Sequence, residues 1–490
     1  MILNLPQKNK SEIKTLLCYN IYMDAEKRAR RQSLRVIISE IIMVIAVVAT
    51  VSVLAFVVSG YWLGSDFKIE RQGLLQIYST PTGADVEVDN NPGSWLQRTN
   101  TSKTLSAGEH TIKLTKDGYD SWSRTISITE GLLYRLHYPR LFLLNRDHES
   151  ALDFSGNFAS VTPNRNTILL ANNTTTWQIF NLDSDSGRPQ SIDLSKILPF
   201  TSLAEGASEG LFTGTIISAD WATDNEHVLL KIAGPATPDA TSIATNWLVL
   251  NIKNPSNSIN LTKEFNADFS EIQILDSSAN NLLAVLNGNL HRIDAGAKQI
   301  SAILAQNVVS FDYYNGDVIF STPSVVSLLK LGSGEIDELI SISEPTQVFA
   351  TKFYDDEYLG LMSGSSAKLY FKKDFVLKSE YDLNFSPASV KVGQHGEFIA
   401  MYTGGHIATL DMEAQAVVDW STDTDSFGWL DGSMIYAVKD GVLNVYDFDG
   451  LNHRTLATNV SAHFPVTITS DKYLYYFKDG TLVREYLYEK

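Results

Sequence analysis

Residues 433–450 read SMIYAVKDGVLNVYDFDG, in which an apolar run, an Asp-Gly turn, an alternating run and a second Asp-Gly turn follow one another. Two strand-like runs joined by a tight Asp-Gly turn predict a β-hairpin. The same order returns in 396–414 (GEFIAMYTGGHIATLDMEA) and in 471–489 (DKYLYYFKDGTLVREYLYE). This part of the chain is therefore predicted to repeat one small β unit.

The repeat extends back through the chain. Three further copies stand at 281–297, 316–334 and 356–374, and two looser copies at 166–187 and 226–254. The later six copies start near residues 271, 308, 350, 388, 427 and 464, a period of roughly 40 residues that is typical of a four-stranded propeller blade. Residues 140–490 are predicted to form a β-propeller, with eight blades favoured and seven if the looser copies are not blades. Stacked β-sandwiches, the alternative, would give no steady period.

The last copy runs out of chain after its third strand. The segment RLFLLN at 140–145, just before the first copy, is predicted to supply the missing outer strand. Pairing the first strand of the propeller with the last blade would close the ring and remove an exposed edge.

Residues 36–62 (VIISEIIMVIAVVATVSVLAFVVSGYW) have no charge, Gly or Pro between Ile41 and Val58. About 20 apolar residues span a bilayer as a helix, so 36–63 is predicted to be a transmembrane signal anchor. Basic residues at 27–35 place the tail 1–35 in the cytoplasm by the positive-inside rule. A signal peptide cleaved near Val58-Ser59-Gly60 and a buried core helix are the alternatives. Translation from Met23 instead of Met1 would shorten the tail.

The charge of the chain is uneven. The whole chain carries a net charge of −17, although residues 1–40 contain eight Lys/Arg and only four Asp/Glu. The part beyond the helix is therefore acidic, which argues against nucleic acid as a partner. The one cysteine, Cys18, lies in the tail, so the outer part has no disulfide and no thiolate metal site. This pattern favours a bacterial or archaeal envelope protein.

After a predicted linker at 64–72, short alternating runs separated by turn residues predict a small β-sandwich at 73–139. Pro81-Thr82-Gly83-Ala84 has the chemistry of a tight turn, because Pro81 fixes φ and Gly83 allows a positive φ. Gly118 before Tyr119 allows a similar reversal, with the Tyr119 ring expected over one end of the core.

These residues resemble the PEGA domain. Pro81-Thr82-Gly83-Ala84 with the strand after it, Gly108-Glu109-His110 and Gly118-Tyr119 match the landmarks of that domain in order and spacing. Thr82 stands where the signature has Glu, and Asn90 to Ser102 is longer than the expected loop. The resemblance implies a small β module of an envelope protein, acting as a spacer or interaction module without chemistry of its own.

No motif predicts a catalytic, cofactor-binding or metal-binding residue. Gly206-Ala207-Ser208-Glu209-Gly210 matches Gly-x-Ser-x-Gly but lacks the strand and helix that a nucleophile elbow needs. His395 and His406 flank one predicted hairpin, where turn or surface positions are favoured over a metal pair. Acidic turns with Ca²⁺-like spacing occur at Asp183/Asp185, Asp423/Asp425 and Asp447/Asp449, but each has too few oxygen ligands for an EF-hand loop.

The favoured function is therefore a membrane-anchored extracytoplasmic binding or scaffold protein that displays a β-propeller on a PEGA-like stalk. The expected partners are the membrane, through residues 36–63, and an envelope protein, a peptide or a cell-wall glycan. The alternatives are an extracytoplasmic propeller enzyme, such as a hydrolase or lyase, and a single-pass receptor. An enzyme requires converging titratable groups at the mouth of the propeller channel.

Overall fold

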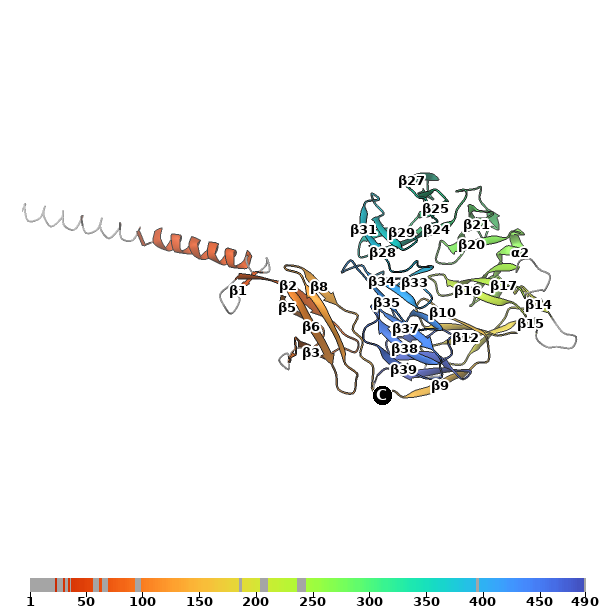
Figure 1. Ribbon diagram of the computed structural model, residues 1–490, viewed down its shortest axis with the longest axis horizontal. Coiled ribbons are helices and arrows are strands. Elements are labelled where there is room, and N and C mark those ends of the chain that lie inside the picture. Colours follow the sequence, from red (N-terminus) through yellow and green to blue (C-terminus); the bar gives the residue numbers. More distant parts are fainter. Residues whose placement is uncertain are drawn as a thin grey trace, which may run out of the picture. The chain divides into compact units, whose positions relative to one another are not determined.

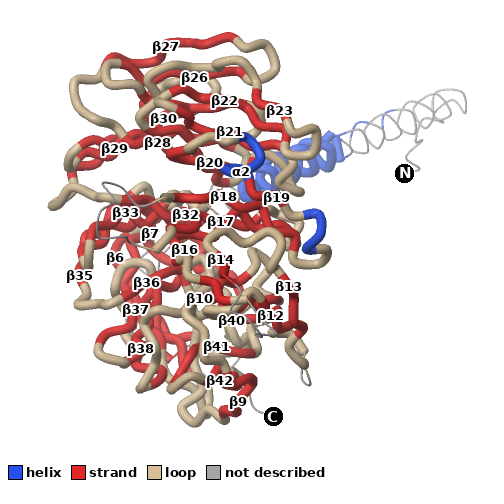
Figure 2. The backbone as a smooth tube through the Cα atoms, turned by 90° about the vertical axis from the view of Figure 1, so that its right-hand side faces the viewer, coloured by secondary structure: helices blue, strands red, loops and turns tan. Residues whose placement is uncertain are grey.

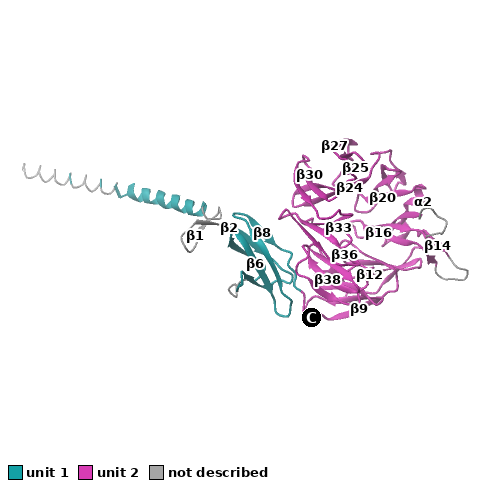
Figure 3. Cartoon of the chain, in the orientation of Figure 1, with its two compact units in different colours: residues 1–141 teal, residues 142–490 magenta. Residues whose placement is uncertain are grey.

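The computed structural model describes residues 37–55, 61–63, 69–92, 98–184, 187–202, 210–235, 244–393 and 396–488, together with residues 23, 30, 34 and 35. The chain divides into two compact units, residues 1–141 and residues 142–490 (Figure 3). The first contains one apolar helix and a β-sandwich, and the second is all-β apart from two short helices among its described residues.

The helix Ile37–Ala55 is apolar (Figure 1), and within the described residues its isoleucine, valine, leucine and methionine side chains are exposed. Its 19 residues extend about 28 Å, close to the thickness of a bilayer core. A helix of this length and composition fits either a membrane span or a signal sequence. The predicted span 36–63 reaches further than this helix, because Tyr61–Leu63 forms strand β1 and pairs with β2.

The sandwich of the first unit consists of two sheets. One contains β1, β2 (Ile69–Ile77) and β5 (Thr101–Ser106), with β8 (Leu133–Leu136) parallel to β2. The other has the order β4 (Asn91–Pro92), β3 (Asp85–Val88), β6 (Gly108–Thr115) and β7 (Trp122–Ile128). Alternate side chains are buried, as in β7, where Trp122, Ile126 and Ile128 face the core. Because β2 begins at Ile69, residues 69–72 of the predicted linker 64–72 belong to this sheet.

The predicted turn chemistry of the sandwich is confirmed. Gly83 has a φ of +78°, and Ala84 behind it is fully buried. The hydroxyl of Thr99 accepts the backbone N–H groups of both residues, at 2.9 and 3.1 Å. Gly118 also has a φ of +78°. Tyr119, however, is only half-buried, and the large ring at the centre of the core is Trp122.

The second unit contains eight four-stranded antiparallel sheets that follow one another around a ring (Figure 1). Between blades 1 and 2 lies the small pair β14 (Thr201–Ser202) and β15 (Leu211–Phe212). Blades 1 to 4 comprise β10 (Phe158–Val161), β11 (Thr167–Ala171), β12 (Thr176–Asn181), β13 (Gln190–Asp193); β16 (Thr215–Trp221), β17 (His227–Ala233), β18 (Thr245–Asn251), β19 (Ile259–Asn260); β20 (Phe269–Ile274), β21 (Asn281–Leu286), β22 (Asn289–Asp294), β23 (Gln299–Ile300); and β24 (Ser310–Tyr314), β25 (Asp317–Ser321), β26 (Val325–Lys330), β27 (Glu335–Ser341).

The remaining blades repeat the pattern, and the prediction of eight blades is confirmed. In blade 2 the short helices η1 (Pro255–Asn257) and α2 (Leu261–Phe265) flank β19 (Figure 2). Blades 5 to 8 comprise β28 (Gln347–Phe353), β29 (Asp356–Ser363), β30 (Ser366–Phe371), β31 (Leu377–Asp382); β32 (Ser389–Val392), β33 (Phe398–Thr403), β34 (His406–Asp411), β35 (Ala416–Ser421); β36 (Ser426–Trp429), β37 (Met434–Lys439), β38 (Val442–Asp447), β39 (Arg454–Ala457); and β40 (Thr467–Thr469), β41 (Tyr473–Lys478), β42 (Thr481–Tyr486), β9 (His148–Asp153).

The first strands of neighbouring blades meet at the centre of the ring. Ser310 and Asp312 of β24 accept the backbone N–H groups of Val348 and Ala350 in β28, at 3.2 and 2.7 Å. The indole N–H of Trp221 in β16 donates to the hydroxyl of Ser160 in β10, a bond between side chains (2.9 Å). The two bonds from β28 satisfy backbone N–H groups on its inner edge, which pairs with no strand in the described chain.

The ring closes through a strand from its own N-terminus. The last blade lacks a fourth strand in its own segment, and β9 pairs antiparallel with β42 to supply it. The prediction that 140–145 fills this place is wrong. Phe142, within that segment, is instead buried in the core formed by blades 7 and 8.

Candidate functional site

Blade 2 carries an open pocket of about 920 Å³, the blade 2 pocket. It lies where the outer strand β19 is only two residues long, so most of the neighbouring edge of β18 has no strand partner. Hydroxyl groups complete this edge, because Ser258 accepts the N–H of Asn251 and Thr262 accepts the N–H of Trp247. The pocket is lined by residues 196–199, 256–260, 263–264 and 278–280 and by His227, Asn246, Val249, Ala295, Gly296 and Lys298.

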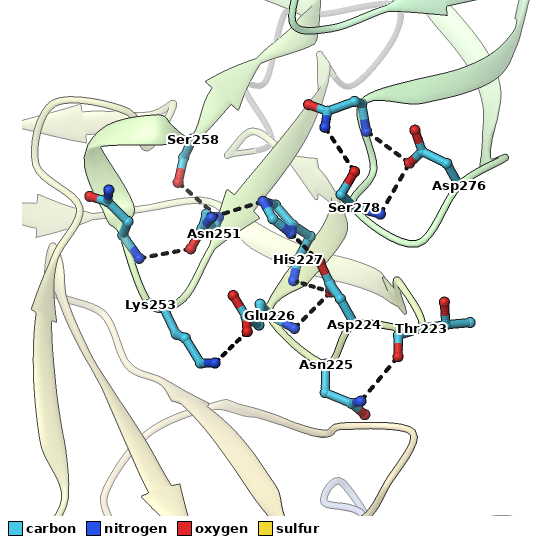
Figure 4. Close-up of polar contacts among 12 residues, drawn as sticks. Thr223, Asp224, Asn225, Glu226, His227, Asn251, Lys253, Ser258, Asp276 and Ser278 are labelled. Atoms are coloured by element: carbon cyan, nitrogen blue, oxygen red, sulfur yellow. Dashed lines mark hydrogen bonds and ion pairs between the residues drawn. The ribbon is translucent and has the colours of Figure 1, made fainter.

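His227 is held rigidly in the wall of this pocket (Figure 4). Its Nδ1 lies 2.6 Å from Oδ2 of Asp224, and its Nε2 lies 2.8 Å from Nδ2 of Asn251. Asn251 Oδ1 accepts the N–H of Asn254 (2.7 Å), which orients the amide so that its nitrogen faces the ring. His227 therefore donates from Nδ1 and accepts at Nε2. Desolvation opposes ionisation of Asp224, but hydrogen bonds from Glu226 and His227 outweigh it and lower the pKa of this carboxyl.

A second set of bonds shapes the facing turn of blade 3 (Figure 4). One oxygen of Asp276 accepts the backbone N–H groups of Ser278 and Asn280, and the other accepts that of Asn281. The Asn280 amide donates to the Ser278 hydroxyl (2.8 Å). Such local bonds are the reason that Asp and Asn favour turns. They hold Ser278 and Asn280 at the edge of the pocket.

The charge of the blade 2 pocket is positive. Lys298 pairs with Glu264 at 3.1 Å, and both line the pocket. Within the described part of the chain, Lys196 and Lys263 form no ion pair. Hydrogen bonds from Ser195 lower the pKa of Asp193, and the positive charge of Lys196 adds a smaller effect in the same direction. The lining thus holds three lysines and one glutamate in a chain whose net charge is −17.

A second titratable group lies on the inner strands of blades 2, 3 and 4. Asp220, Glu271 and Asp312, the channel carboxyls, stand on β16, β20 and β24. Desolvation raises the pKa of each, and for Glu271 repulsion from the other two adds to it while Lys231 opposes it. Among the residues that the structure describes, no hydrogen bond joins these carboxyls to one another.

Sequence reasoning missed both groups. The channel carboxyls left one signal, an acidic residue in the first strand of three successive repeats. The blade 2 pocket left none, because its lysines, asparagines and serines come from separate loops that only the folded ring brings together.

The residues singled out in the sequence lie elsewhere. Residues 206–209, which hold the Ser208 motif, His395 and Asp185 lie outside the described residues. Asp423 and Asp425 both pair with Lys439, at 3.3 and 3.1 Å. Asp447 accepts the Asn452 amide (2.8 Å), and Asp449 accepts the N–H of Leu451 (3.2 Å). Asp183 accepts the hydroxyl of Ser470 (3.0 Å).

Comparison with known proteins assigns part of the chain. Residues 72–139 match the PEGA domain. No curated protein matches the chain. It is similar to Kluyveromyces lactis Hsv2, with 8% identity over 61% of this chain and 97% of that one and a TM-score of 0.40. It is also similar to the dihydro-heme d1 dehydrogenase NirN in complex with DHE, with 11% identity over 62% of this chain and 65% of that one and a TM-score of 0.39. The propeller assignment rests on the eight sheets and the closing strand described above.

Proposed function

We propose that this chain is a membrane-anchored extracytoplasmic binding protein, in which a PEGA domain and a β-propeller stand outside a membrane spanned by the helix Ile37–Ala55. The observation that carries the proposal is an apolar helix with exposed side chains that is followed by a β-sandwich and a β-propeller, and the propeller holds an open polar pocket. The basic residues at 27–35 support a cytoplasmic tail. The partner would be an envelope protein, a peptide or a cell-wall glycan.

Binding is favoured over hydrolysis or elimination because the blade 2 pocket holds its histidine in a structural role. Both ring nitrogens of His227 are engaged by Asp224 and Asn251, so neither faces the pocket as a base. The channel carboxyls have raised pKa values, which general acids need, but no hydrogen bond links them into an acid–base pair in the described chain.

Cysteine labelling in intact cells tests the topology. A membrane-impermeant maleimide should label a Ser333→Cys variant, at an exposed turn of blade 4, without permeabilisation. The native Cys18 should react only after permeabilisation. Labelling of Cys18 in intact cells, or recovery of a soluble chain shortened by its N-terminal segment, would contradict the anchored topology.

A further inference from the structure

We infer that the blade 2 pocket binds an acidic saccharide, a sugar chain whose rings carry carboxylate groups. This inference rests on the proposed binding function and names the ligand class of the same pocket. It follows from three properties of the lining: its donors, its charge and its apolar wall.

The donors suit a ligand rich in hydroxyl groups. The lining contains asparagine amides and serine hydroxyls from three separate segments, including Asn246, Ser256, Asn257 and Ser278. Amides and hydroxyls both donate and accept hydrogen bonds, as sugar hydroxyls do. The network around Asp276 fixes Ser278 and Asn280 before any ligand arrives, which lowers the entropy lost on binding.

The positive charge of the lining favours a ligand that carries carboxylate groups. Lys196 and Lys263 line the pocket, and in the described chain no carboxylate lies within ion-pair distance of either ammonium. A carboxylate that enters between the pocket walls would gain charge-assisted hydrogen bonds from them. The chain as a whole carries a net charge of −17, so a lining with three lysines and one glutamate is opposite in sign to the chain.

The wall and the size suit a ring-shaped ligand. Ile197, Leu198 and Pro199 form one apolar side of the pocket, against which the carbon face of a sugar ring can pack. The volume of about 920 Å³ is at the upper end of the range for small-molecule sites, about 300–1,000 Å³.

Calorimetric titration of the full chain in detergent tests this. The probes are a trimer of galacturonic acid, a neutral trimer of galactose, and sulfate alone. The acidic trimer should bind at least tenfold more tightly than the neutral trimer, and its affinity should fall as salt increases. Lys196→Gln and Lys263→Gln should each weaken it about 2–5-fold, as for the loss of an exposed ion pair. Asn257→Ala should weaken both trimers.

Lys373→Gln, which removes the same charge from an exposed position on blade 5, is the matched control and should leave the affinity unchanged. Thermal melting checks that each variant is folded. Equal affinity for both trimers, or unchanged affinity in the two pocket lysine variants, overturns the inference. Sulfate binding as tightly as the acidic trimer also overturns it, because the pocket would then recognise an anion alone. If the labelling experiment still places the propeller outside the membrane, the proposed function survives that failure.

Discussion

The guanidinium of Arg484 donates to Oε1 of Glu149, at 2.7 Å from Nε, and so joins β42 near the end of the chain to β9 at the start of the propeller. The phenol of Tyr486 donates to the same oxygen (2.9 Å). Beside it, Arg146 pairs with Glu485, which is almost fully buried. The strand that closes the ring is therefore held by two ion pairs as well as by its ladder of backbone bonds.

Glu149→Gln should destabilise the propeller by about 1–3 kcal/mol, because it leaves the buried Arg484 charge without its anionic partner. Urea denaturation of the full chain in detergent, followed by tryptophan fluorescence, measures the loss. Glu338→Gln, at an exposed position of β27, is the control and should change stability by less than about 0.5 kcal/mol. Equal effects of the two substitutions would show that the closing pair adds nothing to stability.

Phe142→Ala should cost about 3–5 kcal/mol, because the side chain is 1% exposed and packs in the core of blades 7 and 8. Leu144→Ala, two residues away and 65% exposed, should cost less than about 0.5 kcal/mol. The same denaturation measurement compares the two. If Leu144 proved as costly as Phe142, the burial described for this segment would be wrong.

The number of blades could be predicted from the sequence, but the strand that closes the ring could not. The repeat length predicted eight blades because each blade is a local unit of hairpins with its own turn residues. The closing strand pairs residues that are more than 300 positions apart, as in Arg484 with Glu149, so no local pattern marks it. The run RLFLLN at 140–145 is more apolar than β9 (His148–Asp153) and so predicted the closing strand more strongly. A buried connecting segment, such as the one around Phe142, has the same apolar composition as a strand.

The blade 2 pocket could not be predicted from a local sequence pattern for a related reason. Turn chemistry at Gly83 depends on one residue's φ, so it can be read from a short motif. The blade 2 pocket depends on a shortened outer strand and on loops from neighbouring repeats, which approach only when the ring forms. His227 and Asn251 are 24 residues apart and give no motif.

The channel carboxyls should make stability depend on pH. A group whose pKa is raised in the folded state gives stability that is fully present below its unfolded pKa and is lost as the pH rises through its folded pKa. Replacing Asp220, Glu271 and Asp312 with the matching amides should therefore stabilise the protein at pH 7 and give little gain near pH 4. Urea denaturation of both proteins from pH 4 to 8 measures the difference. If the amide variant is more stable by the same amount at every pH from 4 to 8, the raised pKa values of these carboxyls do not affect stability.

His227→Ala should destabilise blade 2 by about 1–3 kcal/mol, because the Asp224 carboxylate loses the Nδ1–H donor and the Asn251 amide loses its acceptor. His227→Gln keeps one polar group in the wall and should recover part of the loss. The Asp224 pKa is lowered by its hydrogen bonds, so the stability that it contributes is present above pH 4 and is lost as the pH falls through the folded pKa. Denaturation at pH 7 and at an acidic pH below the lowered pKa of Asp224 measures both effects: the cost of His227→Ala should shrink at the acidic pH, where this carboxyl is protonated. A cost that is equal at both values would show that the ring acts by packing alone and that its bond to Asp224 adds no stability.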